Sequence, residues 1–317
     1  MSVLVVAKAP LLNLQNESGR AEFALPPLGD VVLSPDDILS DDSIGLFLSG
    51  HHDQLLHGLY VNPITYVRYE GFFDDWHEST DKESVIDFDT RSRMCAEALR
   101  VGARAVDAVT TALRLRSEAN VWTPTVLVQV WRDDEFIGSD LRDRGEVWDA
   151  CEPHLGLDDS SASGFDLFPD PYKLRREQLA RIAELAARII ANERPNLAIA
   201  IRRLNRAFDS PEPDECLVDL IIALEALFTA NDEGHISKKL AYRTALYFGQ
   251  KDHISEVVRR SYKLRSDIVH GRQTRESAEK AIDALAGVVR AMLQDALTEP
   301  SKFEMYWKES RKTGEPT

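Results

Sequence analysis

The pattern of hydrophobic and polar residues divides the chain into two parts. Before residue 170, short runs rich in β-branched and aromatic residues are separated by clusters of Pro, Gly and Asp, which is typical of strands and loops. The sequence therefore predicts strands at Val3–Ala7, Ala21–Leu25, Val31–Leu33, Ile64–Tyr69 and Thr125–Trp131. One long helix is expected from Asp89, because small and apolar residues recur at helical spacing as far as Leu113.

After Pro171 the apolar residues follow a helical period throughout. Helices are expected at about residues 173–193, 196–208, 213–228, 237–249, 253–270 and 275–297. A chain of 317 residues is long for a single hydrophobic core, so two domains are expected. The predicted fold class is α+β. A mixed strand and helix domain at residues 1–170 precedes an all-α helical bundle at 171–299, and residues 300–317 form a polar tail.

The helix at 253–270 carries an arginine in its apolar stripe. Arg265 lies in a row with Val258 and Ile268, where a guanidinium is costly unless it is paired or faces a polar cleft. His270 follows five residues later, and Gly271 suits the left-handed position that ends a helix. His270 is therefore expected to cap the helix, and histidine is the side chain whose charge changes near neutral pH.

Glu225 is a carboxylate inside the most hydrophobic predicted helix. A buried acid needs a partner, and an arginine held in an apolar row is a natural candidate. We expect Glu225 to orient Arg265, with Arg243 as a competing partner. The alternative is that Glu225 reaches solvent through a gap in the bundle.

Three blocks of sequence carry a resemblance to a known family. They are Leu220–Phe228 (LIIALEALF), Ile236–Arg243 (ISKKLAYR) and Tyr262–Gly271 (YKLRSDIVHG), which contains the pattern Arg-x4-His. In this order the blocks resemble the Apea-like branch of the HEPN ribonucleases, over about residues 173–298. The pattern Arg-x4-His alone has little specificity, whereas three ordered blocks have much more.

The resemblance implies an all-α HEPN-type bundle that cleaves RNA without a metal or another cofactor. Arg265 would bind and stabilise the scissile phosphate and His270 would transfer protons, giving a 2′,3′-cyclic phosphate and a 5′-hydroxyl. One chain supplies one Arg/His pair, whereas the acid and the base are two separate roles. A homodimer formed through the helical bundles would bring two such pairs to one cleft.

Further roles are expected around these two residues. Supporting residues are Ser266, which can hydrogen-bond His270, Glu225, and Tyr262 one turn before Arg265. The residues expected to contact RNA phosphates are Lys263, Arg272, Arg275 and Arg243. The resemblance also implies prokaryotic antiviral defence by abortive infection, with a protein or small-molecule trigger acting on the N-terminal domain. The alternative is a non-catalytic HEPN module for dimerisation or for binding nucleic acid or nucleotides.

The distribution of charge agrees with a polyanionic partner at one place. The net charge of −15 argues against a surface coated for nucleic-acid binding. Residues 133–170, however, hold twelve acids against two arginines, whereas residues 235–275 hold ten Lys and Arg against three acids. The segment that contains Arg265 and His270 is therefore the locally basic one.

Other constellations of residues are weaker. The three cysteines, Cys95, Cys151 and Cys216, have no metal-like spacing and fit a reducing cytoplasm. His51-His52-Asp53 with His57 resembles a metal cluster only loosely, and Asp36-Asp37 with Asp41-Asp42 lacks the glycine and glutamate of an EF-hand. No signal peptide and no membrane span is recognised, so a cytoplasmic protein is expected.

Overall fold

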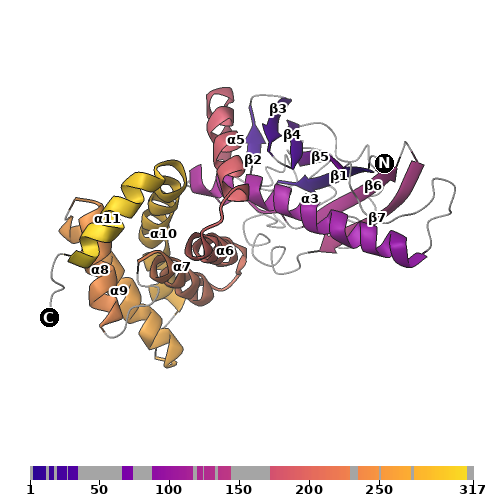
Figure 1. Cartoon of the computed structure of the whole chain (residues 1–317). Coiled ribbons are helices and arrows are strands. Elements are labelled where there is room, and N and C mark those ends of the chain that lie inside the picture. Colours follow the sequence, from indigo (N-terminus) through magenta and orange to yellow (C-terminus); the bar gives the residue numbers. More distant parts are fainter. Residues whose placement is uncertain are drawn as a thin grey trace. The chain divides into compact units, whose positions relative to one another are not determined.

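The computed structural model describes residues 3–11, 14–17, 20–26, 28–34, 66–73, 88–116, 120–123, 125–132, 135–143, 172–228, 235–249, 251–272 and 275–312. The His51–His57 and Asp36–Asp42 groups lie outside these residues. Contacts along the chain divide it into two compact units, Met1–Ile190 and Ala191–Thr317, and each is described by itself. The first contains an antiparallel sheet with helices, and the second is all-helical (Figure 1), which confirms the predicted α+β class.

The first unit is built on a six-stranded antiparallel sheet. Its strands lie in the order β3 (Ala21–Leu25), β4 (Gly29–Ser34), β5 (Tyr66–Phe73), β1 (Val3–Pro10), β6 (Thr125–Arg132) and β7 (Glu135–Asp143). A separate parallel pair joins β2 (Leu14–Asn16) to β8 (Tyr172–Leu174). β7 falls within the acidic stretch that the sequence analysis did not assign to a strand, and it pairs with β6 through a register shift between Val130 and Trp131.

Helix α3 (Phe88–Arg116) packs against one face of this sheet. On that face Val5 and Ala7 of β1 pair with Val130 and Val128 of β6, and all four side chains are fully buried. Gly102 marks the closest approach, because a Cβ atom built there would lie 2.6 Å from the Cβ atom of Ala7. The absence of a side chain at Gly102 is what allows the helix to lie this close to the strands.

Helix α5 (Arg176–Ile190) belongs to the first unit rather than to the helical bundle. It packs on α3, and the Nη2 atom of Arg104 donates a hydrogen bond of 2.8 Å to the carbonyl oxygen of Ile190. The division therefore falls after Ile190, whereas the sequence analysis put it near residue 170. Helical periodicity identified the helix, but only its tertiary contacts assign it to a unit.

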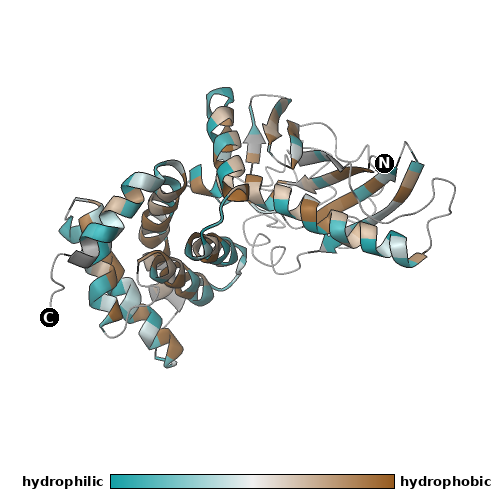
Figure 2. Ribbon diagram, in the orientation of Figure 1, coloured by the Kyte–Doolittle hydropathy of each residue, from teal (hydrophilic) through white to brown (hydrophobic). Residues whose placement is uncertain are grey.

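The second unit is organised around α7. It contains α6 (Pro195–Asp209), α7 (Pro213–Phe228), α8 (Ile236–Tyr247), α9 (Asp252–Val269), α10 (Arg275–Thr298) and α11 (Pro300–Lys312). α7 packs against α6, α10, α9 and α8, as its nearly all-round apolar sequence predicted. Figure 2 shows hydrophobic residues on the inward sides of α6, α7 and α10.

One acid of α7 is buried by two arginines. The side chain of Asp219 is 4% exposed, and its carboxylate lies 2.7 Å from Nη1 of Arg203 and 3.1 Å from Nε of Arg206. Both arginines are on α6, so the ion pairs join α6 to α7 and compensate the buried charge of Asp219.

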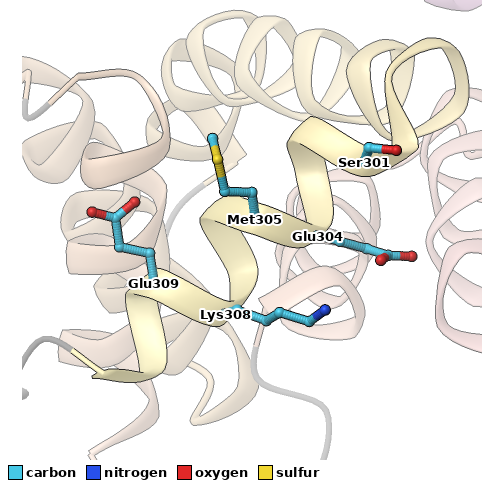
Figure 3. A pocket seen from close by; sticks show the side chains of 5 residues that line it. All are labelled: Ser301, Glu304, Met305, Lys308 and Glu309. Carbon is cyan, nitrogen blue, oxygen red and sulfur yellow. The ribbon is translucent and has the colours of Figure 1, made fainter.

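The segment Pro300–Lys312 is a helix, whereas the sequence analysis expected a polar tail at residues 300–317. Phe303 is buried and stacks on Phe228 with 6.0 Å between ring centroids, and Tyr306 lies edge-on to Tyr247 at 5.3 Å. The inward residues Phe303 and Tyr306 are three positions apart, which is helical spacing that the polar composition of the segment obscured. Figure 3 shows the outer side of α11, where a shallow hollow is lined by Ser301, Glu304, Met305, Lys308 and Glu309.

Among the described residues, no helix combines the length and the apolar character needed to cross a membrane.

We expect Gly102→Ala and Gly287→Ala to have opposite effects on stability. Alanine favours a helix interior over glycine by about 0.5–1 kcal/mol, so Gly287→Ala, whose added Cβ atom meets nothing within 4 Å, should raise the midpoint of unfolding. At Gly102 the same change forces helix and sheet apart at a cost of about 1–3 kcal/mol. Urea unfolding followed by circular dichroism measures both, and an equal gain for the two variants would contradict the close approach.

The packing of α11 is tested by Phe303→Ala with Met305→Ala as its control. Removing the buried ring of Phe303 should cost about 3–5 kcal/mol, whereas Met305, which is 55% exposed on the same helix, should tolerate the change. Thermal unfolding compares the two variants. Similar unfolding temperatures for both would mean that α11 contributes no buried packing.

Candidate functional site

Helix α9 carries most of the predicted site residues, and few of its residues are fully buried. Only Val258 and Ser261 are fully buried, although the helix packs on α8, α10 and α7. Ile254, Tyr262, Arg265 and Ile268 of the expected apolar stripe are half-buried, and Val269 at its end is 64% exposed. The stripe exists as predicted, but the chain covers it only in part.

Arg265 lies over the ring of Tyr262. Its guanidinium carbon is 5.4 Å from the ring centroid, a cation–π distance that stabilises a charge partly withdrawn from water. The Nε atom of Arg265 is buried and has no hydrogen-bond partner within the described chain. The guanidinium is thus held by an aromatic face while part of its hydrogen-bonding capacity stays unused.

Tyr262 interacts with both Glu225 and Arg265. Burial raises the pKa of the Tyr262 phenol, and the negative charge of Glu225, to which the phenol hydrogen-bonds, raises it further, while Arg265 acts in the opposite direction. Tyr262 consequently connects the acid on α7 with the arginine on α9. The direct pairing of Glu225 with Arg265 that the sequence analysis expected stays a prediction. The sequence analysis gave Tyr262 no role between them, although the spacing of three residues between Tyr262 and Arg265 indicates a shared helix face.

Arg243, the expected competing partner for Glu225, binds the C-terminal end of α7. It is 2% exposed, and its Nη1 atom donates a hydrogen bond of 2.7 Å to the carbonyl oxygen of Phe228, at the C-terminus of α7. A cation there complements the partial negative charge of the helix end. The sequence analysis expected Arg243 to contact RNA, whereas in the structure its guanidinium is enclosed by protein.

His270 ends α9 as the sequence predicted. Gly271 adopts φ 68° and donates to the carbonyl of Ile268 at 2.8 Å, and Arg272 donates to the carbonyl of Asp267 at 2.7 Å. These two hydrogen bonds form the Schellman motif, with glycine at the left-handed position. The backbone of the exposed His270 is thereby fixed at the end of the helix, and its N–H donates to the carbonyl of Ser266 at 3.1 Å.

The structure brings Glu225, Tyr262 and Arg265 together and leaves His270 on another side of α9. An ideal helix turns 100° per residue, so His270 projects about 140° from Arg265. Within the described chain no hydrogen bond or ion pair joins the two side chains. Ser266, predicted to support His270, is half-buried between them and contacts it through the backbone hydrogen bond.

The remaining predicted RNA contacts lie on the surface or outside the described side chains. Lys263 and Arg272 are exposed, whereas the side chain of Arg275 is not described. In the described part of the chain no group of three or more potential ligands is arranged to hold a metal ion. The site therefore consists of a half-buried Arg–Tyr–Glu cluster, an exposed histidine and exposed cations.

The chain matches no known protein family, no curated protein and no solved structure.

The link through Tyr262 is tested by Glu225→Gln and Tyr262→Phe. Because the charge of Glu225 raises the pKa of Tyr262, Glu225→Gln should shift the titration of this phenol to lower pH. The absorbance difference between each protein and its Tyr262→Phe counterpart isolates this tyrosine during alkaline titration. Unfolding free energies should change by only about 1 kcal/mol. An unshifted titration would mean that Glu225 and Tyr262 do not interact.

Proposed function

We propose that this chain is a metal-independent RNA endonuclease of the HEPN type. The observation that supports the proposal most is that one helix carries both an arginine packed on an aromatic ring and a histidine at its exposed end. Arginine offers two parallel hydrogen bonds to a phosphate and keeps its charge, and histidine exchanges protons near neutral pH. These two residue types supply the charge stabilisation and the proton transfer that cleavage of a phosphodiester by the adjacent 2′-hydroxyl requires.

In the proposed reaction the 2′-oxygen of one nucleotide attacks the adjacent phosphorus and the bond to the 5′-oxygen breaks. A base removes the proton from the 2′-hydroxyl, an acid gives one to the departing 5′-oxygen, and positive charge stabilises the pentacovalent phosphorane. The products are a 2′,3′-cyclic phosphate and a 5′-hydroxyl. In this scheme His270 transfers protons and Arg265 stabilises the phosphorane, with Tyr262 and Glu225 as positioning residues.

The proposal includes a homodimer. Acid and base are two separate roles, and one chain supplies only one such histidine. Arg265 and His270 also project about 140° apart, so one chain does not direct both side chains at the same phosphate. A second copy would supply the missing group across a shared cleft. The half-buried stripe of α9, with Val269 64% exposed at its end, is a surface that such a copy would cover. Activity should therefore fall on dilution more steeply than protein concentration.

The biological setting that the resemblance implies is prokaryotic antiviral defence. In that setting the N-terminal sheet unit would respond to a protein or small-molecule trigger and restrain the nuclease in its absence.

Cleavage is tested with RNA in the presence of EDTA. We expect the wild-type chain and His253→Ala to cut, and His270→Ala to lose on the order of 10²–10⁴-fold in rate, because a proton-transfer group is removed. His253 is a matched control, since it is an exposed histidine at the other end of α9. The chemistry of the product ends identifies the reaction.

Two results of this assay would count against the proposal. A folded dimer that leaves RNA intact would favour the alternative, a non-catalytic module for dimerisation or for nucleic-acid or nucleotide binding. Cleavage that stops in EDTA would replace the proposed chemistry with a metal-dependent one.

A further inference from the structure

The exposed face of α9 carries a line of polar residues that leads to His270. With 100° per residue, Arg259 and Lys263 project within about 20° of His270, and Ser266 within about 40°. Arg259, Lys263 and His270 are exposed and Ser266 is half-buried. The four positions are 259, 263, 266 and 270, which follow one another at steps of four, three and four residues and so form one row along the helix. We call this row the α9 track.

The two cations of the α9 track are not neutralised by ion pairs in the described chain. Within the described chain, Arg259 and Lys263 form no ion pair, so their charges remain available to a ligand. Two acids, the exposed Glu256 and the half-buried Asp267, project about 40° and 60° from His270, on the side toward Arg260. They separate the track from Arg260, which projects about 80° from His270. The positive charge beside the histidine is therefore confined to one row.

The dimensions of the track fit a nucleic-acid backbone. A rise of 1.5 Å per residue puts Arg259 about 16 Å from His270 along the axis, a length that spans a few nucleotides. Cations spaced along such a row recognise phosphates without reading bases. The row reaches the histidine from the N-terminal side of α9 only, since the helix ends at Val269.

We propose that a single strand of RNA follows the α9 track, with Arg259 and Lys263 holding phosphates on one side of the bond that is cut. This inference rests on the proposed function for the role of His270, but the binding of the strand does not require cleavage. A single strand is expected because attack by the 2′-oxygen needs that oxygen in line with the departing 5′-oxygen. A flexible strand reaches this alignment, whereas the regular A-form duplex holds the backbone away from it.

The substrate must then extend past the cleavage site toward the N-terminus of α9. An RNA that stops at the cleaved bond on that side would leave Arg259 and Lys263 without phosphates. The nuclease would consequently need unpaired nucleotides on that side of the bond, whereas the other side could be a chain end.

The test measures binding of a fluorescein-labelled, ~15-nucleotide single-stranded RNA as a function of salt, in EDTA and in the His270→Ala background so that the probe stays intact. Each phosphate contact contributes about 0.7 to the slope of log affinity against log salt for a single strand. Arg259→Gln and Lys263→Gln should each flatten the slope by about 0.7, which corresponds to a roughly fivefold weaker affinity at 0.1 M salt. Arg260→Gln is the matched control and should leave slope and affinity unchanged.

The outcomes distinguish the hypothesis that RNA binds the α9 track from the hypothesis that the chain cleaves RNA. Equal losses for Arg259→Gln and Arg260→Gln, or no loss in any of the three variants, would overturn the track even if the wild-type chain cuts RNA. Losses confined to Arg259→Gln and Lys263→Gln would support the track even if the wild-type chain cuts nothing. A perfectly paired duplex of the same sequence that binds with the same dependence on Arg259 and Lys263 would overturn the preference for a single strand.

Discussion

The helical unit depends on how α7, a largely apolar helix, accommodates the two acids beyond its first turn, Asp219 and Glu225. A carboxylate that is withdrawn from water must gain a partner of comparable strength, and these two acids meet this condition on different neighbouring helices. Asp219 is held by Arg203 and Arg206 of α6, and Glu225 by Tyr262 of α9. The first pairing is closed by salt bridges and joins two helices, whereas the second ends at Arg265, whose Nε atom has no partner in the described chain. The buried Asp219 thus joins α6 to α7, whereas the half-buried Glu225 belongs to the cluster with Tyr262 and Arg265.

The two proposed functional groups differ in how they are fixed, and the difference suits their roles. Arg265 is positioned by packing on an aromatic ring within the bundle, so its location depends on tertiary structure. His270 is positioned by the backbone hydrogen bonds that end α9, so its location depends on local sequence and on the glycine that follows. A charge stabiliser needs a rigid place, while a group that takes up and releases protons needs access to water.

The sequence predicted those features that are determined locally. β1, β3, β4, β5, β6, α3, α6 to α10 and the end of α9 at Gly271 all follow from hydrophobic period or from backbone preference, whereas α11 was taken for a polar tail. Features set by distant contacts were missed. The sequence assigned α5 to the bundle, because periodicity does not say which surface a helix meets. It gave Arg243 as a competing partner for Glu225 and as an RNA contact, since nothing in its neighbours along the chain indicates that it donates to the carbonyl oxygen at the end of α7. It gave Tyr262 no part between Glu225 and Arg265, because that contact spans two helices.

The hairpin of β6 and β7 bears on how the sheet unit stays free of unwanted association. β7 lies at one edge of the six-stranded sheet, where unpaired backbone groups invite a strand from another molecule to add on. The register shift between Val130 and Trp131 makes this edge irregular, and Glu135 and Asp140 place negative charge along it. A neighbouring copy would bring the same acids to the contact, so like charges and an irregular edge together oppose growth of the sheet into an aggregate.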